Sequence, residues 1–313
     1  MKPFNTLINI SAYFVIYVLW GANFIAIYFA IETIPPFLMV GNRFLLAGLL
    51  LFGFCFLKKI KTPKLSLTLI AVKQGLWLNV GGTGALVWSE QYIPSGLASI
   101  IIATVPLWMV IMDKKNWESY LSNIYIIIGL IAGLSGVILI SNLGGSSGLN
   151  GNNFNFYWGL IILFIGTLCW SYGSLCYKNI KSDFSLVMNL SIQMISAGLI
   201  LLIIGCSLGE LRVFSFKDVS VNSIAGLTYL IFVGSIIGYL SYIWLLRNRP
   251  VAEVGTYTLV NPVVAIILGI FIVHEKITLK MVISILLILL SLFLITYNQK
   301  IRIIISRFYS FKN

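Results

Sequence analysis

The sequence predicts an all-α polytopic membrane protein in which ten transmembrane helices form two inverted five-helix repeats. Three observations lead to this fold class. The 313 residues are 59% hydrophobic and only 10% charged, with a mean hydropathy of +0.99, whereas a soluble domain carries about 25% charged residues. Apolar runs of spanning length recur along the whole chain, and several features occur twice at a constant offset.

Ten apolar segments account for most of the chain. A spanning helix needs about 20 predominantly apolar residues. The segments that meet this requirement are residues 8–30, 36–57, 66–90, 95–112, 122–141, 156–178, 184–208, 222–246, 251–273 and 278–298. Pro36, Pro94 and Pro250 stand at or next to the start of a segment, where the missing backbone N–H breaks no hydrogen bond within the helix.

Repeated prolines indicate an internal duplication. Pro94 and Pro106 lie twelve residues apart, and Pro250 and Pro262 repeat this spacing 156 residues later. Pro106 and Pro262 therefore occupy matching positions inside the fourth and ninth segments. A proline within a helix frees a backbone carbonyl and kinks the helix. We interpret the two prolines as matched hinges beside a central cavity, and a static kink that serves packing is the alternative.

A second offset covers the earlier part of each copy. It is 150 residues and relates Trp20 to Trp170. The predicted domains are a first repeat at 1–141, a linker at 142–155, a second repeat at 156–298 and a basic cytoplasmic tail at 299–313. Trp170 is expected to anchor a helix at the membrane interface, as aromatic residues near helix ends commonly do.

The distribution of lysine and arginine predicts the orientation. With the N-terminus in the cytoplasm, fifteen of these residues lie on the cytoplasmic side and four on the other side, while Arg43 and Lys73 lie within segments. Cytoplasmic loops carry the excess of positive charge, so both termini are expected there. Because each repeat has an odd number of segments, the second repeat enters the membrane from the opposite side.

Inverted repeats favour transport by alternating access, because the two halves can exchange conformations around a central site. The basic residues are scattered between apolar runs, which argues against nucleic-acid binding. The sequence lacks the HExxH, GxxxxGK[ST] and GxSxG motifs and any paired His/Cys spacing for a metal. We therefore expect no enzyme activity, no cofactor and no metal. A membrane-embedded lipid enzyme and a channel are the weaker alternatives.

Several motifs resemble the EamA family of the drug/metabolite transporter superfamily, in its YedA-type branch. They are residues 20–24 (WGANF), 34–37 (IPPF), 42–44 (NRF), 87–90 (VWSE), 93–98 (IPSGLA), 103–107 (ATVPL), 257–264 with its NPV, and Glu275. The resemblance spans nearly the whole chain. It implies an inner-membrane carrier that exports amino acids or related small metabolites. Uptake or exchange of a metabolite derived from a nucleoside or methionine, in an intracellular bacterium, is the alternative. Proton coupling and the choice between monomer and homodimer stay open.

Polar residues inside the predicted membrane segments are the candidate site. Glu253, Tyr257 and Asn261 recur every four residues and so share one helix face, which we expect to line the substrate cavity. Glu253 lies near the cytoplasmic end, where reaching water or pairing with a nearby arginine is an equal alternative. Trp20 and Asn23 lie in the middle of the first segment and are further cavity candidates.

Two basic residues lie within segments. Arg43 stays protonated and needs an acceptor, for which Glu32 and Glu90 are the candidates. A structural clamp is the favoured interpretation, and binding of a substrate carboxylate is the alternative. Lys73 could pair with Glu253 as a cytoplasmic gate, although extension of its long side chain to the interface is favoured.

Overall fold

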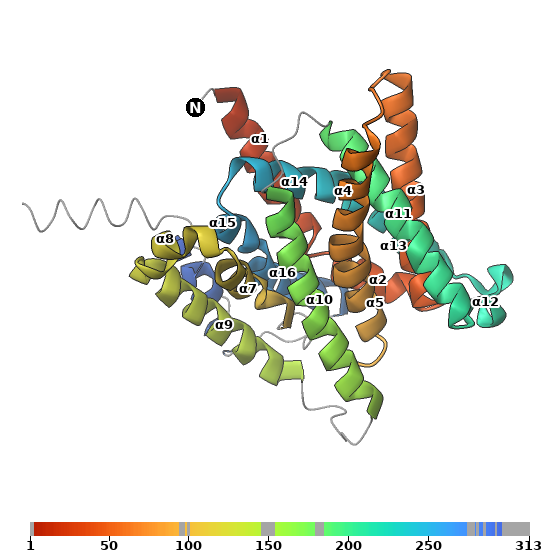
Figure 1. Ribbon diagram of the computed structural model, residues 1–313. Helices are drawn as coiled ribbons and strands as arrows, with labels where there is room; N and C mark the ends of the chain where they lie inside the picture. The colour runs from red at the N-terminus through yellow and green to blue at the C-terminus, as the bar shows by residue number, and fades with distance from the viewer. Residues whose placement is uncertain are drawn as a thin grey trace, which may run out of the picture.

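The computed structural model describes residues 3–93, 98, 101–144, 154–178 and 185–273, together with 279, 282–283, 286–291 and 293–295. Every regular element in these residues is a helix, which confirms the predicted all-α class. Pro94, most of the linker and the basic tail lie outside the described residues. Figure 1 shows α10 crossing the middle of the molecule, with α7, α8 and α9 on one side and α3, α4 and α11 on the other.

The first half of the chain contains eleven described elements, three of which are not α-helical. They are α1 (Pro3–Phe14), η1 (Val15–Leu19), α2 (Asn23–Ala30), α3 (Pro36–Leu57), α4 (Leu65–Gly75), η2 (Leu76–Gly84), α5 (Ala85–Ser89), α7 (Val105–Met112), η3 (Lys114–Asn116), α8 (Trp117–Leu121) and α9 (Ile124–Gly144). Here η1 and η2 are π-helical and η3 is a 3₁₀ turn.

The second half begins with two long unbroken helices and continues with shorter elements. Its elements are α10 (Phe154–Lys178), α11 (Leu186–Ser207), α12 (Glu210–Val213), η4 (Phe216–Asp218), α13 (Val221–Tyr229), η5 (Leu230–Ile237), α14 (Gly238–Asn248), α15 (Val251–Gly255) and α16 (Tyr257–Val273). The stretch η5 is π-helical and joins α13 to α14 without a loop.

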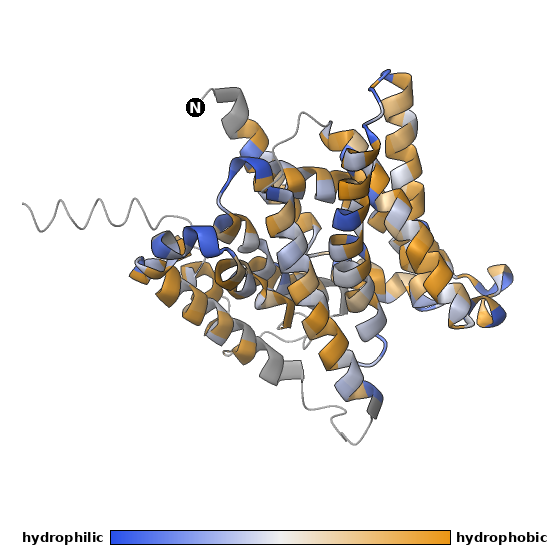
Figure 2. Cartoon of the chain, in the orientation of Figure 1, coloured by the Kyte–Doolittle hydropathy of each residue, from blue (hydrophilic) through white to orange (hydrophobic). Residues whose placement is uncertain are grey.

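Four helices of the described residues are long and apolar enough to cross a membrane. They are Pro36–Leu57, Asn155–Lys178, Leu186–Ser207 and Val221–Asn248. A fifth span results if Leu7–Leu19 and Asn23–Ala30, which meet at a bend of 45°, count as one. Helix occurs in each of the ten predicted segments, but several are broken or short, so ten full spans stay a prediction. Hydrophobic residues run along the long helices, and hydrophilic ones gather at helix ends and connections (Figure 2).

The predicted start of α3 is confirmed, because the helix begins at Pro36 with Pro35 as its N-cap. Similarly, Pro250 precedes α15 directly. Helix breaks also follow a local rule. At Thr256, between α15 and α16, the threonine hydroxyl donates to the carbonyl oxygen of Glu253 at 2.6 Å. The same carbonyl accepts the backbone N–H of Thr256 at 3.3 Å, so the threonine adds a second donor to it at the end of α15.

The helices α3 and α11 pack against each other through reciprocal glycine contacts. A Cβ atom on Gly48 would lie 2.7 Å from the backbone nitrogen of Ile195, and one on Gly198 would lie 2.5 Å from the backbone nitrogen of Leu45. Gly48 and Gly198 are 150 residues apart, as are Leu45 and Ile195. The same contact therefore occurs twice with the two halves exchanged, which is the signature of a two-fold relation.

The two helices run in opposite directions at this contact. Gly48 lies against Ile195, whereas Gly41 lies against Leu202, so residue numbers fall along α11 as they rise along α3. A two-fold axis that relates antiparallel helices lies perpendicular to both. Only glycine allows the backbones to approach this closely, and small residues serve the same purpose in membrane helix pairs generally.

Candidate functional site

A cavity of about 90 Å³ lies between the two halves of the chain. Its walls come from the junction of η1 and α2, from α3, η2, α5 and α7 in the first half, and from α10, α14 and α16 in the second. This volume is well above the roughly 10–15 Å³ that a cavity needs to hold one water molecule, and the small size of the cavity suits a small solute.

Five aromatic rings pack together at the cavity, and we call them the aromatic floor. The ring of Trp20 lies at the centre of this cluster. Its centroid is 5.9 Å from that of Trp170, 5.3 Å from that of Tyr239, and 5.2 Å from those of Tyr242 and Tyr257. All four pairs are tilted or edge-to-face, the arrangements that aromatic pairs prefer, each worth about 0.5–1.5 kcal/mol beyond the buried area. The floor is therefore a fixed surface for apolar groups.

Hydrogen bonds hold the two indole rings in place. The Nε1 of Trp20 donates to the carbonyl oxygen of Gly234 at 2.8 Å, and the Nε1 of Trp170 donates to the hydroxyl of Tyr242 at 3.1 Å. That hydroxyl also shares a 2.6 Å hydrogen bond with Ser174. Gly234 belongs to the π-helical stretch η5, and such stretches are frequent at functional sites.

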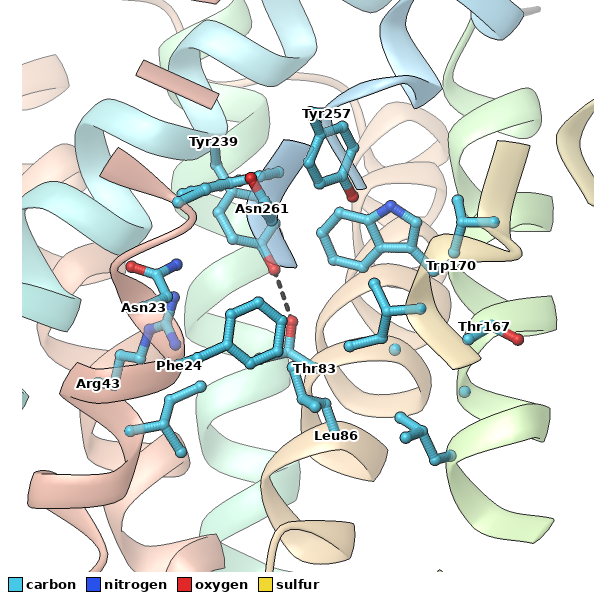
Figure 3. A pocket seen from close by; sticks show the side chains of 17 residues that line it. Asn23, Phe24, Arg43, Thr83, Leu86, Thr167, Trp170, Tyr239, Tyr257 and Asn261 are labelled. Carbon is cyan, nitrogen blue, oxygen red and sulfur yellow. Dashed lines mark hydrogen bonds between the residues drawn. The ribbon is translucent and has the colours of Figure 1, made fainter. Parts of the chain in front are cut away.

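Equivalent positions of the two copies meet inside this cavity. Thr83 and Tyr239 are 156 residues apart, the offset of the two proline pairs, and their hydroxyls share a 2.8 Å hydrogen bond (Figure 3). Trp20 and Trp170, related by the offset of 150, are in ring contact. Two contacts between matched positions therefore occur at the cavity. They add to the matched contacts of Gly48 and Gly198 between α3 and α11.

The three polar residues predicted to share one face of the ninth segment lie in two different environments. Tyr257 and Asn261 line the cavity and are 5% and 4% exposed. With its amide nitrogen directed towards η1, Asn261 donates to the carbonyl oxygen of Ile16 at 3.0 Å. Glu253 does not line the cavity. Its Oε1 instead accepts a 2.6 Å hydrogen bond from the hydroxyl of Tyr13.

Further contacts surround Glu253 on the predicted cytoplasmic side of the cavity. The hydroxyls of Tyr17 and Thr256 share a 2.8 Å hydrogen bond, and the Nε1 of Trp244 donates to Oδ1 of Asn9 at 3.1 Å. Together with the Tyr13–Glu253 bond, these contacts join the first segment to the eighth and ninth. We call this set the Tyr13–Glu253 closure.

Arg43 is buried at the cavity wall, with 2% of its side chain exposed. Its Nε donates to Oγ of Ser235 at 2.8 Å, and its guanidinium carbon lies 5.2 Å from the ring centroid of Phe44. The predicted pairing with a glutamate is not seen, because Glu32 is exposed and Oε1 of Glu90 has no hydrogen-bond partner in the described residues. Placing an arginine deep in a membrane costs about 2.5–3.5 kcal/mol on insertion scales.

The remaining predicted residues lie away from the cavity. Lys73 is exposed on α4 and, in the described part of the chain, makes no hydrogen bond or ion pair with Glu253. Pro106 is the second residue of α7, and Pro262 lies inside α16. A Cβ atom on Gly255 would lie 3.4 Å from Cα of Pro106, so the fourth and ninth segments pack against each other. Hinge motion at the two prolines stays a prediction.

Trp170 corrects one expectation. Its position near a helix end suggested an interfacial anchor, but the structure buries it to 8% exposure in the cavity wall. The reason is its ring contact and hydrogen bond to Tyr242, which hold it inside the bundle. Thr83, Tyr239 and Phe24 also line the cavity (Figure 3). The repeat offset could have identified the first two of these, since Thr83 is the counterpart of Tyr239.

Comparison with protein families gives two adjacent matches. The EamA-like transporter family matches residues 7–142 and again residues 157–297. Among the described residues, no group of three or more His, Cys, Asp or Glu side chains lies close enough to hold a metal ion.

Individual relatives are named as transporters. The chain is 35% identical to the uncharacterized inner membrane transporter YedA of Escherichia coli K12, over 83% of this chain and 81% of the relative. It is 26% identical to the uncharacterized transporter YoaV of Bacillus subtilis, over 90% and 94%. The "Probable amino-acid metabolite efflux pump" of Escherichia coli K12 is 23% identical, over 83% and 85%. A protein of known crystal structure shares the fold, with a TM-score of 0.71 at 14% identity over 95% of this chain and 98% of the other.

Proposed function

This chain belongs to the EamA-like transporter family, and from that premise we propose that it is a secondary transporter for small amphipathic metabolites in the bacterial inner membrane. It works by alternating access about the cavity between its two halves. The observation that carries the proposal is the meeting of equivalent residues, Thr83 with Tyr239 and Trp20 with Trp170, at the walls of one cavity. A site on a symmetry axis is the place where both halves can act alike.

The proposed architecture is two inverted five-helix repeats, at 1–141 and 156–298, with both termini in the cytoplasm. The reciprocal, antiparallel contacts of Gly48 and Gly198 support it, because an axis perpendicular to two spanning helices lies in the membrane plane. The two family matches, at 7–142 and 157–297, also support the division. The fifteen-to-four distribution of basic residues supports the orientation.

Alternating access requires that one side of the cavity be closed while the other is open. In this structure the Tyr13–Glu253 closure joins the ends of the first and ninth segments on the proposed cytoplasmic side. We propose that these contacts form the cytoplasmic gate and that they open when the outer side closes. Glu253 then serves the gate and not the binding of substrate. Tyr257, Asn261, Trp20 and Asn23 face the cavity and would contact the solute.

We propose export of amino acids or related metabolites as the direction and substrate class. The efflux pump of Escherichia coli among the relatives supports this choice by its name. Uptake or exchange of a metabolite is the second candidate. The driving force would be a proton or ion gradient, counter-substrate exchange or the gradient of the solute itself.

Two measurements test the proposal. The first compares the metabolites retained by cells with and without the protein, which identifies candidate solutes. The second measures flux of these solutes into proteoliposomes that contain the purified protein. A carrier gives saturable flux that rises when the same solute is present on the opposite side. Flux that increases without saturation would identify a channel and refute the carrier mechanism.

A further inference from the structure

The positive charge of Arg43 has no carboxylate to neutralise it in the described cavity. Among the described residues, Arg43 contacts the neutral hydroxyl of Ser235 and the ring of Phe44. The guanidinium stays protonated under all ordinary conditions, and a buried charge without a counter-ion is unfavourable. Arg43 therefore differs from a structural clamp, which would be paired with an acidic side chain.

Arg43 is the only charged residue among the described residues that line the cavity. The wall residues are aromatic, aliphatic, glycine, threonine or asparagine, apart from Arg43. One fixed positive charge in an otherwise neutral cavity selects a ligand with one negative charge. A dianion would bring an uncompensated charge into the bundle, and a cation would be repelled.

A second polar group lies beside the guanidinium. A Cβ atom built on Gly234 would lie 2.9 Å from Oδ1 of Asn23 and 3.0 Å from Nη2 of Arg43, so the two groups are within about 6 Å of each other. Figure 3 shows both on the same side of the cavity, beside Phe24. The Oδ1 atom of Asn23 is buried and has no hydrogen-bond partner in the part of the chain that the structure describes. It is available to accept a hydrogen bond from an N–H or O–H group next to the bound anion.

The opposite side of the cavity is apolar. Trp170 lies across from Arg43 and Asn23 (Figure 3), and Tyr257 and Trp20 continue the same aromatic surface. A ligand that extends from Arg43 to this surface needs a charged end and an apolar body. The small volume of the cavity, about 90 Å³, restricts that body to a few carbon atoms.

We propose that Arg43 binds the carboxylate of a small monocarboxylic solute, with Oδ1 of Asn23 accepting from a donor next to that carboxylate and the aromatic floor holding its apolar group. This inference rests on the proposed transport function, because it assigns the substrate class of the same cavity. The guanidinium suits this role because its N–H groups match both oxygens of a carboxylate.

The test measures ligand-dependent thermal stabilisation of the purified protein in detergent with matched pairs of probes. The acids are isovalerate and leucine, and their controls are isovaleramide and leucinamide, which keep the apolar body and remove the carboxylate. Isopentylamine tests for a cation site. We expect the acids to raise the melting temperature and to bind at least about tenfold more tightly than the amides, which is a difference of about 1.4 kcal/mol in binding free energy.

Two variants assign the effect to Arg43. Arg43→Gln should weaken binding of the acids by at least about tenfold, whereas Lys73→Gln, which removes one positive charge from the exposed face of α4, should leave it unchanged. If Arg43→Gln does not fold, Arg43→Lys replaces it, and the acid–amide comparison on the unaltered protein needs no variant. Equal stabilisation by acids and amides, preference for the amine, or unchanged binding by a folded Arg43→Gln protein each overturn the proposal.

Binding in detergent does not depend on transport. If acids bind at Arg43 but proteoliposomes show no flux, the transport function fails while the site stands. If a solute is transported with saturation and Arg43→Gln leaves its flux unchanged, the site fails while the transport function stands.

Discussion

Thr83 of η2 and Tyr239 of α14 share a 2.8 Å hydrogen bond although they occupy the same position in the two copies of the repeat. A contact between equivalent positions places both residues next to the axis that relates the halves. In the alternating-access mechanism proposed above, the bond lies where the two halves would move relative to each other.

We predict that Thr83 and Tyr239 are energetically coupled. The variants Thr83→Val and Tyr239→Phe each remove one hydroxyl of the bond. Their double-mutant cycle for the free energy of unfolding should give a coupling of about 0.6 kcal/mol, the mean for hydrogen bonds between membrane helices. Tyr28→Phe is the control, since Tyr28 is 68% exposed. Strict additivity of the two substitutions would show that the bond does not contribute.

The reciprocal glycines should be intolerant of even one methyl group. Gly48→Ala and Gly198→Ala each place a Cβ atom 2.7 Å or less from a backbone nitrogen of the facing helix, and overpacking of this kind costs about 1–3 kcal/mol. We expect lower melting temperatures and less folded protein in the membrane. Gly53→Ala on the same helix is the matched control, because nothing lies within 4 Å of its Cβ position. Equal tolerance at all three positions would contradict the packing.

The fold was largely predictable because apolar length and proline position are local signals. Pro36 begins α3 as predicted, and the 36–57 segment matches its helix in both bounds. The breaks were not predictable in the same way. The bend between Leu19 and Asn23 and the π-helical stretches η2 and η5 depend on contacts with other helices, such as the bond from Trp20 to the Gly234 carbonyl.

The site was predictable only in part, for a similar reason. Periodicity placed Glu253, Tyr257 and Asn261 on one helix face. It could not show that the helix breaks at Thr256, so that Glu253 belongs to the Tyr13–Glu253 closure while Tyr257 and Asn261 line the cavity. Arg43 was recognised as needing an acceptor. Which acceptor it has depends on the approach of η5, which brings Ser235 to its Nε and leaves the glutamates elsewhere.

Removing the Tyr13 hydroxyl should loosen the Tyr13–Glu253 closure. A hydrogen bond contributes about 0.5–1.5 kcal/mol, so Tyr13→Phe should raise the open population on that side by about two- to twelvefold. Hydrogen–deuterium exchange of α15 (Val251–Gly255) should accelerate accordingly. Tyr28→Phe should leave that exchange unchanged. An α15 that exchanges at the same rate in Tyr13→Phe would show that the bond does not hold the closure.

The charge distribution predicts where the termini and the linker lie. A fluorescent protein fused after Asn313 should fold and fluoresce, because the C-terminus is expected in the cytoplasm. A cysteine placed within residues 145–150 should react with a membrane-impermeant thiol reagent added outside intact cells. The opposite result at either position would reverse the orientation or change the number of spans.

Alternating access is tested most directly by locking the Tyr13–Glu253 closure. Cysteines replace Tyr13 and Glu253 in a background without the four native cysteines, and a reducible bifunctional reagent joins them in proteoliposomes. Solute flux should stop when the pair is joined and return on reduction, while either single-cysteine variant treated with the same reagent keeps its flux. Undiminished flux through fully cross-linked protein would contradict a mechanism in which this side must open.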